Sequence, residues 1–533
     1  MPLLARGLLV GLLFVLLSSP PALQQWIGGD TRAHVVVTIA MAMAAIALVA
    51  GWTLIGERRR TGPPAGRPEG GRYLSGYSWV GVLAAALLIA TAHSWVREIL
   101  TIPIDPYRGD MLVVVREGLR RMFGGLNPYT IYHVPWAAPL PYGPVLWGPY
   151  ALPMAMRIDI RFLTVAGALF IPTACAIAAL VAARRRQLAA AAAALAVLAA
   201  IAMNGDLARF TTIGHTPVYW PLIALFAWLV SREHWLSSAL TIGLLVVART
   251  TMVAIVPVLL MTVWIRDRRR IVSVCAVLAL AVALPFLPFA IWDPRALAYA
   301  LYGSYETVIK TVVWPDPTVP HTIGLTGVLL TNHLNRWVEA VQIAVIVVVY
   351  AVCWRMIGRG RAPIALMALA LLAFSMTTLW PVYYIYFDVF LMMAAALLAD
   401  TPWLARASSV TDVMRAWAGT AAAALAVVAA TSLLMLRTHT TGRATVTWRD
   451  PRTASVVLMR PAASTAFVDI QVAGSGGSSQ MDVAVNGTRL RPVALAGDHV
   501  ILSVPRENWQ VGLNTLDLAF TSPVTIGNVT VQP

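Results

Sequence analysis

The strongest candidate for acid–base chemistry is Asp110, which stands directly before an amphipathic stretch, residues 111–123. A carboxylate beside an acceptor hydroxyl can take its proton while a new bond forms to that oxygen. Asp is also a favoured helix N-cap, so capping of the following helix is the alternative role for Asp110. Asp105 precedes Pro106 and fits a turn residue as well as a substrate-binding residue.

Four further side chains in polar segments suit the binding of an anion. Lys310 and His321 belong to one long polar segment, whereas Arg209 and His215 share a short one. A cation at these positions could hold an anionic group, and His321 could also take part in proton transfer. The alternatives are an interfacial role for Lys310, with its charge reaching water, and a solvated loop position for His321.

The composition indicates where these residues must act. The 533 residues are 59% hydrophobic and 12% charged, and the mean hydropathy is +0.73. A typical soluble protein has a charged fraction of about 25%, so most of this chain is expected to lie in lipid. The net charge of +16 then reflects Arg-rich cytoplasmic loops and not a nucleic-acid partner. The three cysteines, Cys175, Cys275 and Cys353, lie in apolar runs that suit neither a metal site nor a disulfide.

Apolar runs and arginine clusters predict about 11–13 membrane helices, with the Arg-rich short loops all on one side. The first run is expected to be a retained anchor, because no clear cleavage pattern follows it. The run 236–265 is interrupted by Arg249-Thr250-Thr251 and predicts two short helices that enter and return. The amphipathic stretch 111–123 predicts a helix that lies on the bilayer surface. The expected domains are a membrane hairpin (1–56), a cytoplasmic linker (57–76), a transmembrane catalytic core (77–436) with outer loops 97–160 and 292–336, and an extracytoplasmic β-sandwich (437–533).

The C-terminal segment has the alternation of apolar and polar residues that is typical of strands, for example at 468–472 and 481–485. Asn486-Gly487 predicts a tight hairpin turn, and about eight strands of a β-sandwich fit the segment. The runs 500–505 and 512–518 resemble jelly-roll carbohydrate-binding domains. A spacer or stability domain without a ligand is the alternative.

The order of elements over residues 95–160 resembles the C-superfamily (GT-C fold) of integral-membrane glycosyltransferases, above all glycosyltransferase family 87 and related polyprenol-phosphate mannosyltransferases. The elements that carry the resemblance are the acidic Asp110, the amphipathic stretch 111–123, a G-x-NPY element at Gly125–Tyr129 and a Y-x-P element at Tyr142–Pro144. The chain departs from the pattern in its added N-terminal hairpin and its short acidic signature, which leaves Asp105 as a second candidate acid.

The resemblance implies a GT-C-like fold and the transfer of a hexose or pentose, with inversion. The donor would be a polyprenyl-phosphate sugar, and the acceptor an extracytoplasmic glycan or glycolipid of the cell envelope. Asp110 and His321 are the expected catalytic residues; the expected substrate-binding residues are Lys310, Arg209, His215, Tyr142, Asn127 and Asp105. No DxD pair, HExxH motif or paired-cysteine set occurs, so neither a metal nor another cofactor is expected.

The expected location is the plasma or inner membrane, with many passes. Two other hypotheses stay open. One is a transporter or flippase of lipid-linked saccharides, for which repeated halves and charged residues in mid-span would be expected. The other is a scaffold whose β-domain binds cell-wall glycan.

Overall fold

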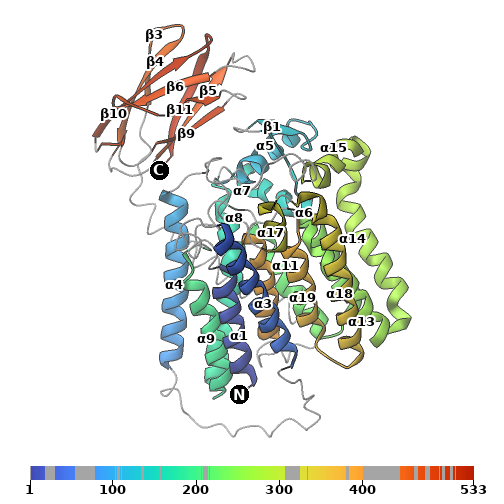
Figure 1. Ribbon diagram of the computed structural model, residues 1–533. Helices are drawn as coiled ribbons and strands as arrows, with labels where there is room; N and C mark the ends of the chain where they lie inside the picture. Colours follow the sequence, from blue (N-terminus) through green and yellow to red (C-terminus); the bar gives the residue numbers. More distant parts are fainter. Residues whose placement is uncertain are drawn as a thin grey trace.

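The computed structural model describes residues 2–18, 31–54, 78–101, 104, 109, 111–133, 137–156, 158–205, 207, 214, 216–305, 324–332, 334–379, 383–399, 444–460, 466–473, 480–490, 492–494, 499–504, 508–510 and 512–532. Most of these residues are helical, and the C-terminal ones form β-sheets (Figure 1). The helices are α1 (Pro2–Ser18), α3 (Thr31–Leu54), α4 (Ser78–Thr101), α5 (Met111–Phe123), α6 (Pro144–Trp147), η1 (Gly148–Tyr150), α7 (Ala151–Ala155), α8 (Arg161–Arg184), α9 (Leu188–Ala202), η2 (Thr216–Tyr219), α11 (Trp220–Ser231), α12 (Trp235–Ala248), η3 (Thr250–Ile255), α13 (Val256–Arg266), η4 (Arg268–Arg270), α14 (Ile271–Trp292), α15 (Pro294–Ala298), the π-helix η5 (Tyr299–Gly303), α17 (Leu325–Thr331), η6 (Asn335–Trp337), α18 (Val338–Gly358), α19 (Pro363–Met376), η7 (Tyr383–Tyr386) and α20 (Phe387–Ala399).

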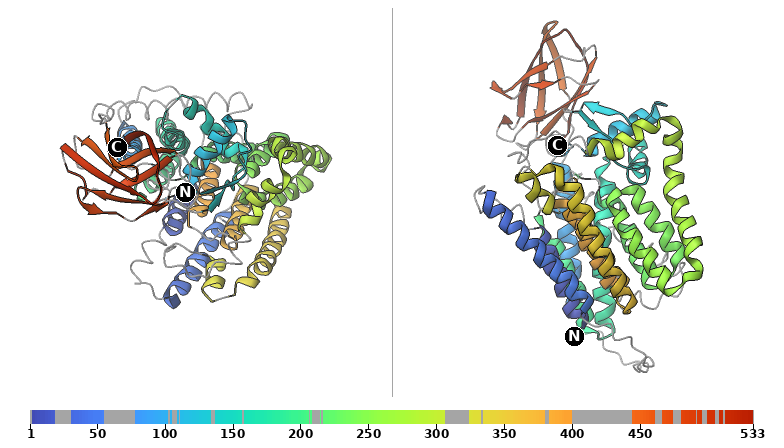
Figure 2. Two further views of the ribbon diagram at one scale, coloured as in Figure 1. Left: turned by 90° about the horizontal axis from the view of Figure 1, so that it is seen from above. Right: turned by 45° about the vertical axis from the view of Figure 1, so that its right-hand side comes forward.

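Four helices are long and apolar enough to cross a membrane by length and composition: Trp79–Leu100, Arg161–Arg184, Arg268–Trp292 and Asn335–Gly358. Eight shorter apolar helices accompany them among the described residues. This set matches the predicted apolar runs, except that the last predicted span, at about 417–436, lies outside the described residues. In the right-hand view of Figure 2, α3 and α14 lie at opposite edges of the helical region.

The N-terminal helix α1 is part of the main hydrophobic core. It packs against α9 and α20. The ring of Phe14 lies 4.1 Å from that of Phe390, measured between centroids. Gly7 meets α9 so closely that an added Cβ would stand 2.6 Å from the Cβ of Ala193. The N-terminal hairpin of α1 and α3 is therefore packed against the later helices α9, α19 and α20.

The buried side chain of Arg161 joins the start of α8 to the end of α4. Arg161 is 3% exposed, and its Nη2 donates to Asp159 Oδ2 at 2.6 Å and to the carbonyl of Ile99 at 2.8 Å. These contacts fix the base of the segment that the sequence predicts as the first outer loop.

The amphipathic helix α5 has the bounds that the residue spacing predicts. Most of its apolar residues, for example Val115 and Leu119, are buried in the main core, whereas Phe123 at its end is 54% exposed. Gly118 lies under Leu140, whose Cδ2 would be 3.1 Å from an added Cβ. The expectation that this helix lies on a bilayer surface is therefore wrong for its apolar face, which packs on protein.

The interrupted apolar run forms two helical segments that return on themselves, as predicted. Glu233, just before α12, pairs with Arg266 at the end of α13, with 2.7 Å between Oε1 and Nη1. Helix α12 also packs against α6. The chain reverses at Arg249, where the backbone is extended between α12 and η3.

The C-terminal strands form two antiparallel sheets that share one core. The strands are β3 (Ala444–Asp450), β4 (Thr453–Arg460), β5 (Ala466–Ala473), β6 (Gln480–Val485), β7 (Thr488–Arg489), β8 (Val493–Ala494), β9 (His499–Val504), β10 (Gly512–Phe520) and β11 (Thr525–Gln532). One sheet has the order β3-β4-β10-β6-β7, with β8 also on β6, and the other has the order β11-β5-β9.

Buried side chains of both sheets belong to one cluster, as the predicted sandwich requires. The turn at Asn486-Gly487, with both φ angles positive, joins β6 to β7 as expected. In Figure 1 the two sheets lie beyond the end of the helical region that carries α5 and the small hairpin β1 (Ile131–His133) with β2 (Ala137–Pro139).

Candidate functional site: a cavity at the ends of short helices

A cavity of about 460 Å³ lies where several short helices end. Its walls come from the α12–η3 break, the end of α19 and η7, and from parts of both predicted outer loops. Helices α11, α12, α19 and α20 have only 12–14 residues, which corresponds to about 18–21 Å at 1.5 Å per residue. This is shorter than the roughly 30 Å hydrocarbon core of a bilayer. The short helices therefore leave room for a cavity at one end of the helical region.

Arg249 is the one charged residue among the described residues that line this cavity. Its side chain is 11% exposed, and its Nε lies 3.4 Å from Oδ2 of Asp388. The guanidinium also lies over the ring of Tyr384, 5.7 Å from the centroid. The other lining residues are mostly apolar or aromatic. The Asp388 carboxylate meets the Nε edge of the guanidinium, and Arg249 also lines the cavity, so the cavity suits an anion attached to an apolar body.

Asp388 lies behind Arg249 at the start of α20 and is fully buried. Its Oδ2 accepts a hydrogen bond of 2.8 Å from the hydroxyl of Tyr219, which ends η2. Its Oδ1 has no hydrogen-bond partner among the described residues. Tyr219 and Arg249 therefore both contact the same carboxylate oxygen, Oδ2 of Asp388.

Pro141, Tyr142 and Leu146 form one wall of the cavity, which we call the roof. The G-x-NPY element holds the roof through a hydrogen bond to Tyr142. The side-chain oxygen of Asn127 accepts from the backbone N–H of Tyr129 at 3.0 Å, which fixes the turn. The hydroxyl of Tyr129 donates to the carbonyl of Tyr142 at 3.0 Å. Burial raises the pKa of Tyr129 well above its ordinary value, although its hydrogen bond with Trp147 lowers it, so this hydroxyl stays a donor at neutral pH.

The roof is also held against the end of α12. Gly143 packs on the backbone of Val247, and a Cβ at position 143 would stand 1.8 Å from the Val247 carbonyl oxygen. Only a glycine allows this approach. The segment that carries Tyr142 is therefore held against the end of α12 by a contact between backbones.

The second predicted outer loop begins at the same cavity. Tyr302 and Tyr305, at and after the π-helix η5, line it together with Gln342 of α18. The hydroxyl of Tyr302 lies 3.5 Å from Oε1 of Glu339, also on α18. The two predicted outer loops, 97–160 and 292–336, thus contribute walls to one cavity.

Two of the predicted site residues lie in the described part of the chain. Tyr142 lines the cavity, and Asn127 supports the roof from outside it. The other predicted site residues lie outside the described residues, and their roles stay predictions: Asp105, Asp110, Arg209, His215, Lys310 and His321. Asp110 is the residue directly before α5.

Arg249 is the site residue that the sequence argument missed. The sequence predicts only a break between two helices at this position. A single charged residue within the largely apolar run 236–265 is itself a reason to expect a functional site. Asp388 gave the same kind of indication, as an acidic residue that is costly in an apolar run unless it faces a cavity.

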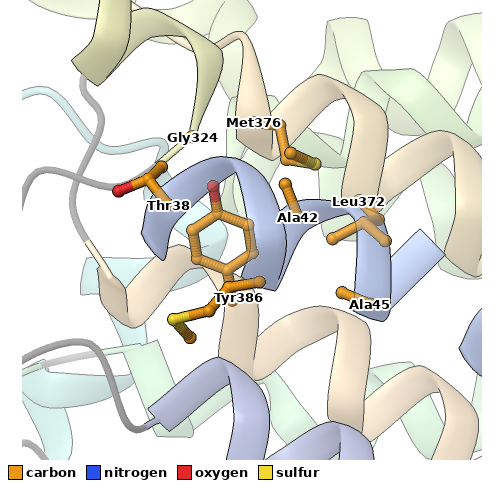
Figure 3. Close-up of a pocket in the computed structure, with 8 residues that line it drawn as sticks. Thr38, Ala42, Ala45, Gly324, Leu372, Met376 and Tyr386 are labelled. Carbon is orange, nitrogen blue, oxygen red and sulfur yellow. The ribbon is translucent and has the colours of Figure 1, made fainter. Parts of the chain in front are cut away.

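A second, much smaller cavity of about 20 Å³ lies between α3 and α19. Figure 3 shows the ring of Tyr386 beside Thr38 and Ala42 of α3, and Met376 of α19 near them. This space is about the size of a water molecule, so it is too small for a sugar or a lipid head group.

Among the described residues, no group of three or more His, Cys, Asp or Glu side chains is arranged to hold a metal ion. No protein family matches the chain, and neither curated proteins nor solved structures gave a match.

Proposed function

We propose that this chain is an integral-membrane enzyme that transfers a sugar from a polyprenyl-phosphate donor to an extracytoplasmic glycan or glycolipid. The observation that carries the proposal is Arg249, a cation on the wall of an otherwise uncharged and mostly apolar or aromatic cavity of about 460 Å³. Binding sites for small molecules have volumes of about 300–1,000 Å³. A sugar phosphate on a greasy chain has the size, the charge and the apolar part that such a cavity suits.

The transfer reaction requires few protein side chains. The acceptor hydroxyl oxygen bonds to the anomeric carbon while the bond from that carbon to the phosphate oxygen breaks. The electron pair leaves with the polyprenyl phosphate, and Arg249 stabilises the added negative charge. The acceptor proton goes to a carboxylate, for which Asp110 is the candidate. Attack opposite the leaving group inverts the anomeric centre.

The experiment is sugar transfer by the purified full-length chain, with a radiolabelled polyprenyl-phosphate sugar as donor. Asp110→Asn should abolish transfer while leaving membrane insertion normal. Asn caps helices about as well as Asp, so this change removes the base but keeps the cap.

Asp293→Asn is the matched control. Asp293 caps α15, with its Oδ1 accepting from the N–H groups of Arg295 and Ala296 at 3.0 Å. This variant should transfer sugar normally. Full transfer by Asp110→Asn would remove Asp110 from the mechanism.

We further propose that the enzyme lies in the plasma or inner membrane, with its C-terminal β-domain outside the cytoplasm. The support is the set of apolar helices together with the arginine clusters between them. A membrane-impermeant maleimide should label intact cells at Gln480→Cys but not at Ala65→Cys. The unmodified chain, with Cys175, Cys275 and Cys353, is the control. The reverse pattern would overturn the assignment of both sides.

The rival hypothesis is a flippase of lipid-linked saccharides. One observation favours it: the Arg249–Asp388 ion pair is buried between short helices, where a transporter would carry charges. Proteoliposomes separate the two hypotheses. Movement of the lipid-linked sugar between leaflets, with no sugar transfer to any acceptor, would favour the flippase.

A further inference from the structure

Three side chains from separate parts of the chain converge on one buried oxygen. Arg249 comes from the α12–η3 break, Tyr219 from the end of η2, and Asp388 from the start of α20. Arg249 Nε lies 3.4 Å from Asp388 Oδ2, and the Tyr219 hydroxyl lies 2.8 Å from the same atom. Of the three, only Arg249 lines the cavity.

This arrangement leaves part of Asp388 unsatisfied. The residue is fully buried, yet its Oδ1 has no hydrogen-bond partner among the described residues. Burying a carboxylate with one oxygen unpaired costs stability, and an apolar residue at this position would avoid that cost. The carboxylate is oriented toward Arg249 and Tyr219 instead. Such an arrangement points to a role in function more than in folding.

We infer that Asp388 and Tyr219 are positioning residues, which hold the guanidinium of Arg249 where a phosphate in the cavity meets it. This inference rests on the proposed function. An arginine side chain has many rotamers, and ordering it only when the ligand binds would weaken binding. The Asp388 carboxylate holds the Nε edge of Arg249, and the Tyr219 hydroxyl fixes that carboxylate. The ligand class is a phosphomonoester on an apolar chain.

The test measures binding separately from sugar transfer. The full-length protein in detergent is titrated with farnesyl phosphate, and farnesol serves as the probe without the anion. Arg249→Gln should lose most of the difference in affinity between the two probes. Tyr219→Phe removes only a hydroxyl and should weaken farnesyl phosphate binding roughly 5–10-fold, as expected for the loss of one hydrogen bond of ordinary strength.

Tyr350→Phe is the matched control. Its hydroxyl also makes one partly buried hydrogen bond, to the carbonyl of Ala254 at 3.0 Å, and Tyr350 does not line the cavity. This variant should bind farnesyl phosphate like the unmodified chain. Equal losses from Tyr350→Phe and Tyr219→Phe would show a general effect of buried hydroxyls and would overturn the inference.

A double-mutant cycle shows whether Tyr219 acts through Arg249. In an Arg249→Gln background, adding Tyr219→Phe should change the affinity by less than about twofold, because nothing is left to position. Additive losses would overturn the inference. Asp388→Asn should weaken binding more than Tyr219→Phe, and Asp388→Glu should restore part of it. If Asp388→Asn does not fold, the Tyr219 cycle still decides.

The two proposals fail separately. Sugar transfer by the unmodified chain, together with additive losses in the cycle, would leave the proposed function standing without these positioning residues. Non-additive losses in a chain that transfers no sugar would leave a lipid-phosphate site whose reaction is not glycosyl transfer. If farnesyl phosphate and farnesol bind equally to the unmodified chain, Arg249 does not bind the phosphate and the inference fails.

Discussion

A methyl group added at Gly143 should disrupt the roof of the cavity. An added Cβ would stand 1.8 Å from the carbonyl oxygen of Val247, whereas ordinary contact begins at 3.4 Å, so the separation must grow by about 1.6 Å. Val247 belongs to α12, where the helix holds its backbone. The roof segment must therefore move, and the position of Tyr142 in the cavity wall changes with it. Displacement by about 1 Å can cost an enzyme roughly 100-fold in rate.

Gly148→Ala is the control for this change. Gly148 lies five residues further on, at the start of η1, and nothing lies within 4 Å of a Cβ there. We expect Gly143→Ala to lower sugar transfer at least 100-fold and the free energy of unfolding by about 1–3 kcal/mol, as for overpacked cores. Gly148→Ala should leave both nearly unchanged. Radiolabel transfer and thermal melting in detergent measure the two quantities. Similar activity in the two variants would refute the argument that the roof is held by this close contact.

Three further changes test the supports of the site. Tyr129→Phe removes the hydroxyl that holds the roof and should cost about 1 kcal/mol of stability, measured by thermal melting; no change would mean that the roof does not depend on it. Burial opposes ionisation of Asp159, but the charge and hydrogen bonds of Arg161 lower its pKa below the ordinary value. Its contribution to stability is therefore present above the ordinary pKa and lost as the pH falls through the lowered one. Asp159→Asn should lower the melting temperature at pH 7 and progressively less at acid pH, and a pH-independent difference would contradict this. Gly324→Ala should destabilise more than Gly360→Ala: both glycines have positive φ, but only at 324 would a Cβ meet other atoms, at 2.7 Å. Equal melting temperatures would show that this contact yields.

Features that depend on neighbours in the sequence were predictable. The bounds of α5 follow from apolar residues at helical spacing. The turn follows from the residue types at Asn486-Gly487, which readily adopt the positive φ angles that the structure has there. The break at Arg249 was also predictable, because a charged residue interrupts an apolar run.

The partners of these features were not predictable. Hydropathy marks the break at Arg249 but does not show that Asp388 and Tyr219 lie beside it, because these contacts depend on how distant helices pack. The apolar face of α5 was misjudged for the same reason. An amphipathic pattern shows that one face is buried, and it does not show whether lipid or protein buries it.

The packing of α1 bears on how the protein is assembled during synthesis. Phe14 of α1 packs on Phe390 of α20, a helix that is translated far later. At about 5–20 residues per second, the interval is roughly 20–75 s. During that time α1 lacks its contact with α20, and lipid or a protein of the insertion machinery must cover that face. The core therefore closes last, when the two ends of the helical region meet.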